Sequence, residues 1–292
     1  MLKLNVQKKV AVAVFAAMAI FFDFAAISCK STSEIAKVEP IQLLSADSDA
    51  YFSIPVQPNF EFSKKLVKSF ADKSISENDV VRILERVDTI FAGTNLSGTK
   101  FELSASGNFP VALSKFFLTE KNGWKKHKFS SYSYNEHLDS AFSLSFISSD
   151  LVCIASSADA TEKQLSKCDA IRSGENVQNV EFETSPSDIT FYFPDSKGIL
   201  SMLVGQNQML LSCFKSASGS LSQIQGVQAF SLKLELELAD PRMKMAVSGI
   251  LRLAFLGTPV EISTSDNSVS IAGLALDWAS VFALACGSAS GV

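Results

Sequence analysis

Few residues of this 292-residue chain have the type and spacing that catalysis or metal binding requires. The two histidines, His127 and His137, have no second ligand nearby at metal-site spacing. Residues 212–215 fit the Ser-x-x-Lys pattern of some acyl enzymes, but so short a match arises easily by chance in a Ser-rich chain. Gly-rich phosphate loops, Gly-x-Ser-x-Gly elbows and paired carboxylates are also missing. The sequence therefore argues against an enzyme, a metal site and a bound cofactor.

A different chemistry is indicated at Cys29, which follows Ala26, Ile27 and Ser28. A small residue directly before a cysteine is typical of the bacterial lipobox, in which the cysteine is acylated, for example with palmitate, and becomes the first residue of the mature protein. Ala26 stands where Leu is preferred. We predict lipid attachment at Cys29. The alternative is a membrane-anchored N-terminal helix in which this cysteine is incidental.

The segment before Cys29 is typical of an export signal. Three lysines precede an apolar run from Val10 to Ile27 that only Asp23 interrupts. A charged start, a short apolar stretch and small residues at its end favour cleavage over a membrane span. We predict a lipoprotein signal peptide over residues 1–28 and a lipidated N-terminus with a polar linker over residues 29–40.

The charge and the cysteines restrict the possible partners. Removing residues 1–28 takes away three Lys and one Asp, so 26 basic and 30 acidic residues become 23 and 29, a net charge of −6. Nucleic acid is therefore not an expected partner. Export permits disulfides, but buried thiols are the simpler expectation, and no pairing follows from spacing. The remaining cysteines are Cys153, Cys168, Cys213 and Cys286.

Two short segments of the chain echo each other. Residues 48–55 and 187–194 share Ser, Asp, Phe and Pro in register, and Ser106-Gly107 is echoed by Ser248-Gly249 at a similar offset. We predict a diverged duplication with a first α/β half over residues 41–172 and a second over 173–292 packed on the first. The expected fold class is α+β, with antiparallel strands flanked by amphipathic helices.

Apolar spacing predicts the individual elements. Expected helices cover residues 60–73, 77–93, 110–117, 158–167, 196–204 with an extension to 214, and 274–285. Expected strands cover residues 48–55, 99–107, 129–134, 142–147, 151–155, 187–194, 232–238, 260–263 and 269–272. Residues 243–255 fit neither the helical nor the strand period.

Two segments combine apolar residues with positive charge, as membrane-surface segments do. The first is the predicted basic amphipathic helix from residue 60, and the second places an indole beside three lysines. An ordinary core-facing helix and a turn with its indole folded underneath are the respective alternatives. The candidate membrane-contacting residues are Phe60, Phe62, Lys64, Lys65, Leu66, Lys68 and Phe70 in the helix, and Trp124, Lys125, Lys126 and Lys128 in the second segment.

An ordered set of residues resembles the treponemal concealed outer-membrane lipoprotein family. The set comprises Asp49, Tyr51, Pro55, Val56, Ile83, Arg86, Phe101, Leu103, Ser106, Gly107, Pro110, Gly123 and Trp124. It continues through Ser156, Ser157 and Leu165 into the second half, where residues 206–223 look like an insertion. The resemblance implies helices flanking a sheet, anchorage to the periplasmic leaflet of the outer membrane, insertion of amphipathic helices into lipid, and a permeabilising or lipid-handling role.

The leading hypothesis is thus a lipid-anchored, periplasm-facing outer-membrane protein that binds or inserts into phospholipid bilayers through amphipathic helices. Two alternatives remain from other classes. One is a periplasmic carrier with a cavity for an apolar ligand. The other is an envelope scaffold that binds another protein through the same apolar faces.

Overall fold

The computed structural model describes residues 37–70, 76–95, 100–139, 142–204 and 208–281. Within these residues the chain forms twelve strands together with α-helices and short 3-10 helices, so the predicted α+β class is confirmed. The chain forms two compact units. The first contains residues 37–47, 60–93 and 100–181, and the second contains residues 48–59, 94–95 and 182–281.

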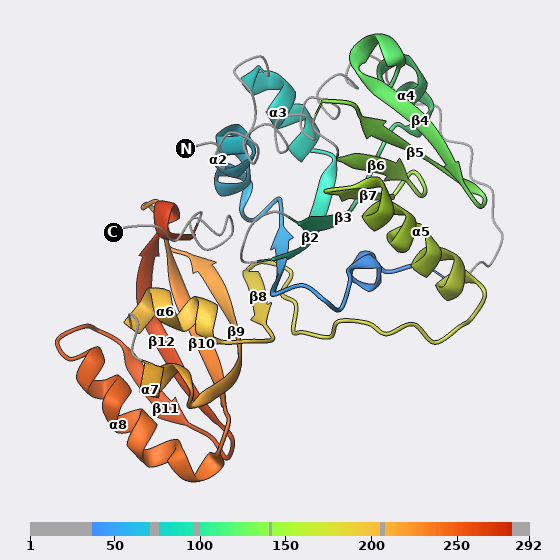
Figure 1. Ribbon diagram of the computed structural model, residues 1–292. Coiled ribbons are helices and arrows are strands. Elements are labelled where there is room, and N and C mark those ends of the chain that lie inside the picture. The colour runs from blue at the N-terminus through green and yellow to red at the C-terminus, as the bar shows by residue number, and fades with distance from the viewer. Residues whose placement is uncertain (1–36, 71–75, 96–99, 140–141, 205–207, 282–292) are drawn as a thin grey trace. The chain divides into compact units, whose positions relative to one another are not determined.

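The first unit is built around antiparallel strands in the order β2-β3-β7-β6-β5-β4. These strands are β2 (Val87–Thr94), β3 (Phe101–Gly107), β4 (Trp124–Phe129), β5 (Tyr132–His137), β6 (Ser143–Phe146) and β7 (Leu151–Ala155). The helices are η1 (Pro40–Leu43), α2 (Phe60–Phe70), α3 (Glu77–Leu84), α4 (Val111–Phe117), η2 (Glu120–Asn122) and α5 (Ala158–Arg172). Helix α5 packs on β5, β6 and β7 (Figure 1).

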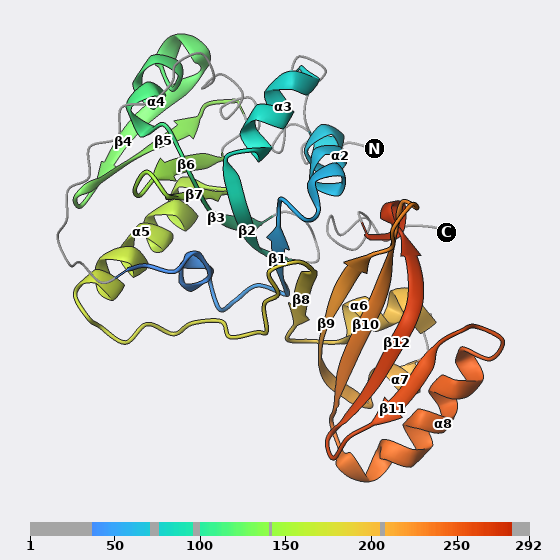
Figure 2. The ribbon, with the colours of Figure 1, turned by 180° about the vertical axis from the view of Figure 1, so that it is seen from behind.

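The second unit has strands in the order β11-β12-β10-β9-β8-β1. They are β1 (Ala50–Pro55), β8 (Ile189–Phe193), β9 (Phe214–Gln223), β10 (Ala229–Leu238), β11 (Glu261–Thr264) and β12 (Ser268–Asp277). Helices α6 (Lys197–Val204), α7 (Gln208–Leu211) and α8 (Lys244–Ala254) lie on one face of this sheet, and η3 (Pro241–Met243) precedes α8 (Figures 1 and 2).

Strand β10 shows why this sheet is covered on one face. Leu232, Leu234, Leu236 and Leu238 are all buried, whereas Lys233 and the acidic residues that alternate with them point to the wetter side. Side chains alternate between the faces of a strand, so an alternating sequence requires a cover on one face and tolerates water on the other. The predicted strand and its wet face are confirmed.

The two echoed segments pair with each other. Strands β1 and β8 are antiparallel neighbours, with Phe52 opposite Phe191 and Ser53 opposite Thr190. The units also repeat a topology, because the order β2-β3-β7-β6 matches β9-β10-β12-β11, and a helix follows β3 and β10 alike. A duplication would produce such a repeated order and stays a prediction; the β4-β5 hairpin has no counterpart in the described part of the second unit. The shorter echo is not equivalent, since Ser106-Gly107 ends β3 while Ser248-Gly249 lies inside α8.

Several expected boundaries are wrong, and each has a local cause. Helix α3 ends at Leu84, because residues from Val87 onward join the sheet as β2. The expected strand over 129–134 is interrupted by a hairpin turn at residues 130–131, where Ser130 has a φ of 52°, and its last three residues belong to β5. Residues 274–277 continue β12, so the last helix begins only at Trp278, and its predicted end lies outside the described residues.

The ambiguous segments also have clear outcomes. Residues 244–254 form helix α8, although the spacing of their apolar residues fitted neither a helix nor a strand clearly. The expected helix over 196–214 is divided into α6 and α7, and residue 214 already belongs to β9. The strand expected over 260–263 is confirmed within one residue as β11, whereas β12 is longer than the strand expected over 269–272.

Two glycines provide a test of these packing relations. A Cβ atom at Gly219 of β9 would lie 2.2 Å from the Lys233 carbonyl oxygen and 2.6 Å from Phe191 Cζ, whereas one at Gly249 of α8 would meet nothing within 4 Å. We expect Gly219→Ala to lower the free energy of unfolding by roughly 1–3 kcal/mol through overpacking. We expect Gly249→Ala to raise it by roughly 0.5–1 kcal/mol through helix propensity. Urea denaturation of both variants measures the two signs, and equal signs would contradict this packing.

Candidate membrane-contacting surfaces

The chain that follows the predicted lipid site is fixed into the first unit. Cys29 itself lies outside the described residues, but Val38, Pro40, Leu43 and Leu44 are buried. The Ser104 hydroxyl donates to the Pro40 carbonyl oxygen at 2.6 Å. An apolar arm thus begins nine residues after the predicted acylation site and ends in the core.

Two ionisable side chains hold the end of this arm. The Ser45 N–H donates to Glu102 Oε2 at 2.6 Å, and the Lys167 ammonium donates to the Leu44 carbonyl oxygen. Burial raises the pKa of Glu102, although the Ser45 N–H opposes that shift. Burial also lowers the pKa of Lys167, against the attraction of Glu102. Each group compensates part of the desolvation cost of the other, as buried ionisable groups require.

Helix α2 carries most of the residues predicted to contact membrane. Its apolar side is turned into the protein, because Phe62 and Val67 are buried and Phe60 and Leu66 are partly buried. Phe70 is the last residue of the helix. The helix is amphipathic as predicted, but the apolar side of its described part is already covered in this structure.

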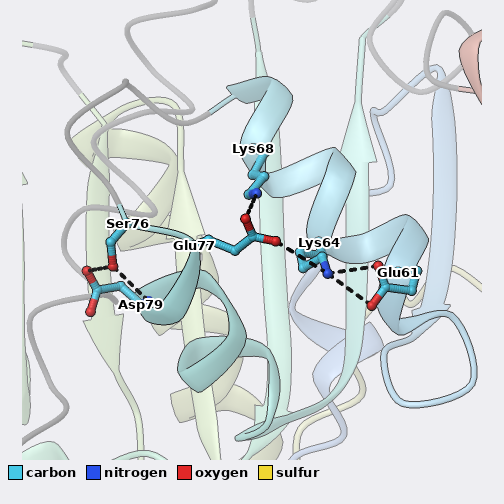
Figure 3. A network of polar contacts seen from close by, with 6 residues as sticks. All are labelled: Glu61, Lys64, Lys68, Ser76, Glu77 and Asp79. Atoms are coloured by element: carbon cyan, nitrogen blue, oxygen red, sulfur yellow. Dashed lines mark hydrogen bonds and ion pairs between the residues drawn. The ribbon is translucent and has the colours of Figure 1, made fainter.

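Two lysines of α2, Lys64 and Lys68, contact carboxylates (Figure 3). Lys64 Nζ lies 2.8 Å from Glu61 Oε2 and 3.6 Å from Glu77 Oε1, and Lys68 Nζ lies 2.7 Å from Glu77 Oε2. The hydrogen bond to Glu61 raises the pKa of Lys64, and the hydrogen bond from Lys68 lowers the pKa of Glu77. Such exposed pairs add little stability. They do reduce the positive charge that these two lysines present to an anionic surface.

The same network begins helix α3. The Asp79 N–H donates to the Ser76 hydroxyl oxygen at 3.2 Å, which makes Ser76 the N-cap, and the Ser76 hydroxyl donates to Asp79 Oδ2 at 2.6 Å (Figure 3). Glu77 at the first helical position suits the positive end of the helix dipole. Glu77 therefore links the N-terminus of α3 to two turns of α2, while Lys65 of α2 is exposed.

Trp124 lies in a buried aromatic group at the start of β4. Its indole is 4% exposed and meets His137 and Phe142 edge-to-face, with ring centroids 5.0 and 5.3 Å apart. The following lysines, Lys125, Lys126 and Lys128, are exposed along β4. Trp124 would have to leave this aromatic group to reach lipid, so its role in membrane contact stays a prediction.

Helix α8 presents an apolar surface that the sequence analysis did not single out. Val247 and Leu251 face the unit's interior and are completely buried. On the outer side Met245, Leu253 and Leu256, the last just beyond the helix, are 77%, 73% and 79% exposed. Large apolar side chains at this exposure are informative when they gather on one element. Because apolar residues occur on both sides of α8, its sequence fits neither the helical nor the strand period. This lack of a clear period is the only sign of the exposed apolar side that the sequence contains.

The candidate residues for catalysis or metal binding make ion pairs and hydrogen bonds within the protein. Lys215 lies in strand β9, and its ammonium is 3.1 Å from Glu237 Oε1, so this side chain is paired with a carboxylate. The nearby Ser265-Asp266-Asn267 tripeptide, which accompanies Ser-x-x-Lys in some acyl enzymes, occupies the turn before β12, where the Ser265 and Ser268 hydroxyls are 2.7 Å apart. His127 Nε2 lies 3.0 Å from Glu136 Oε2.

The other expected groups can be located as well. Cys153, Cys168 and Cys213 are buried, and the Tyr132 hydroxyl donates to Cys168 Sγ at 3.2 Å. Burial raises the pKa of the Cys168 thiol. The described part of the chain holds no cluster of three or more His, Cys, Asp or Glu side chains placed to bind a metal ion. Among the same residues no helix combines the length and the apolar composition needed to cross a bilayer.

The comparisons with known proteins identify the class. Residues 35–280 match a family of outer membrane-associated lipoproteins, which confirms the predicted class and its association with the outer membrane. The chain belongs to the family described as outer membrane-associated lipoprotein TP0453. This is the resemblance that the residues had indicated, and the description names no enzyme activity.

Solved structures share the fold. The structure of crystal form I of TP0453 has a TM-score of 0.64 and 16% identity, and the match covers 86% of this chain and 98% of that chain. Crystal form III has a TM-score of 0.64 and 15% identity, with 86% and 99% covered. At this identity the likeness shows the fold alone. No curated protein sequence matches the chain.

The aromatic group around Trp124 predicts a pH dependence of stability. Desolvation lowers the pKa of His137 from its ordinary value of 6.5, against the attraction of Asp139. Folding therefore favours the neutral ring, and this contribution is complete above pH 6.5 and is lost as the pH falls through the lowered folded-state pKa. As the pH falls from 6.5 to the folded-state pKa of His137, we expect the melting temperature of His137→Gln to decline less than that of the parent protein. Parallel melting curves for both proteins across pH would show that His137 does not contribute.

Proposed function

We propose that this lipoprotein is acylated at Cys29, faces the periplasm from the outer membrane, and binds the bilayer through an exposed amphipathic helix. The observation that carries this proposal is the outer side of α8, where Met245, Leu253 and Leu256 are exposed together. A surface of this kind is typical of helices that lie in the membrane interface. Family membership supports the outer-membrane location.

The free energy that the exposed side chains of α8 would contribute to bilayer binding can be estimated. Fully burying one Leu or Met side chain is worth about 1.5–3 kcal/mol, so three such side chains suffice for measurable vesicle binding. A triacylated cysteine would already attach the chain firmly. In that case α8 serves mainly to hold the protein against the leaflet and to perturb it, which is how binding could alter permeability or give access to lipid.

Helix α2 has a conditional place in this proposal. Its apolar residues face the protein and two of its lysines contact carboxylates, so it would contact lipid only after leaving its present packing. The outer side of α8 is exposed without any rearrangement. We therefore place the first membrane contact on α8 and retain the predicted residues of α2, Trp124 and the β4 lysines as elements of a later inserted state.

Serine substitution on α8 tests the bilayer contact. In the mature chain with Cys29→Ala, which carries no acyl group, we expect Met245, Leu253 and Leu256 changed together to Ser to weaken vesicle binding at least about 100-fold, because the exposed apolar area is lost. Co-sedimentation with vesicles measures this. Leu138→Ser with Val227→Ser is the matched control, since these side chains are 60% and 53% exposed but lie outside α8. Equal loss in both variants would remove α8 from the site.

The anchor has its own test. We expect Cys29→Ala in the full precursor to abolish acylation and to leave uncleaved or mislocalised protein, because lipidation needs the thiol and the lipoprotein peptidase acts on the modified cysteine. Metabolic labelling with a palmitate analogue measures acylation. Label that persists in the variant would exclude Cys29 as the lipid site.

A further inference from the structure

The exposed side of α8 carries a stripe of apolar residues that runs along the helix. Met245, Gly249 and Leu253 recur at four-residue spacing, so they form one stripe along the helix, and all three are exposed. Ala246 and Leu256 are exposed as well. Because Gly249 and Ala246 are small, the bulky side chains protrude as separate groups above a low surface. Separate protruding side chains fit into gaps between lipid headgroups better than they fit against a flat protein surface.

The charges near this stripe nearly cancel. Between residues 240 and 262 the chain has three basic and two acidic residues, a net charge of +1. The Arg242 guanidinium lies 2.7 Å from Asp240 Oδ2, so this pair is neutral as a unit. Arg252 donates to the Ile262 carbonyl oxygen at 3.5 Å, and Glu261 precedes Ile262 in strand β11. In this count of charges between residues 240 and 262, Lys244 is the one basic residue without an acidic counterpart.

The charge of the whole chain opposes an anionic membrane. The net charge is −4 for the full sequence and −6 after removal of residues 1–28. Two of the three lysines of α2, Lys64 and Lys68, already contact Glu61 and Glu77. Electrostatic attraction is therefore a minor part of the free energy with which α8 meets a leaflet.

We propose that α8 recognises loosely packed leaflets through its protruding apolar side chains and does not select anionic lipid. This inference rests on the proposed function and adds its lipid preference. The partner is a zwitterionic bilayer with packing defects, such as one of unsaturated phosphatidylcholine or of high curvature. Amphipathic helices with bulky apolar residues and little charge bind such surfaces, whereas lysine-rich helices bind anionic ones.

The test measures how the same mature Cys29→Ala chain binds to vesicles of different lipid composition. A single uncompensated cation near an anionic leaflet is worth about a fivefold gain in binding. We therefore expect vesicles with roughly a third phosphatidylglycerol to bind at most about fivefold better than pure unsaturated phosphatidylcholine, with little effect of added salt. Saturated, tightly packed phosphatidylcholine should bind at least about tenfold more weakly than unsaturated phosphatidylcholine.

Charge variants give the matched control. Lys244→Gln with Arg252→Gln should bind phosphatidylcholine vesicles as the parent does, while the triple Ser variant of α8 should lose binding. A gain of more than about 25-fold on anionic vesicles, abolished by salt, would overturn the lipid preference while leaving the proposed function intact. Equal binding of the triple Ser variant and its parent would instead overturn the proposed function.

One further outcome concerns a protein partner. Sedimentation of the parent and the triple Ser variant without vesicles shows whether the α8 stripe joins two copies of the chain. We expect both to sediment alike. A parent dimer that the Ser variant converts to monomer would assign the stripe to self-association and would overturn the lipid assignment.

Discussion

Burial of the apolar side of antiparallel strands is the constraint on which this fold depends. Strand β10 shows it most simply, because every second residue is a buried leucine and the residues between them face water. A sheet with one such face needs helices over that face only. In the second unit α6, α7 and α8 provide the cover, and in the first unit α5 packs on three strands. Helix α8 is unusual because it also has apolar residues on the side that covers nothing.

The parts of the fold that local patterns encode could be predicted. Strand β10 alternates strictly, α5 begins at a Ser157 N-cap, and α2 has a clear apolar side, so each was expected close to its place. These features depend on interactions within a few residues of one another, which a single sequence contains.

Features that depend on distant partners could not be predicted. The spacing of Val80, Ile83, Val87 and Phe91 suits a helix, yet the last two belong to β2 because β3 is available to pair with it. A buried indole followed by lysines has the same local sequence in an edge strand as in a membrane-surface turn, and lysines on an edge strand also discourage aggregation. Only the contacts of Trp124 with His137 and Phe142 distinguish the two conformations.

If Cys29 is acylated as proposed, the buried arm that follows it would limit how far the protein can move from the membrane. Nine residues separate Cys29 from Val38, and an extended chain of that length reaches about 30 Å. An acyl group at Cys29 would therefore keep the first unit inside a thin layer next to the leaflet, and later contacts would become intramolecular. The effective concentration of lipid seen by any tethered surface then reaches the millimolar range. A surface with weak intrinsic affinity can remain bound under these conditions and still release its lipids readily.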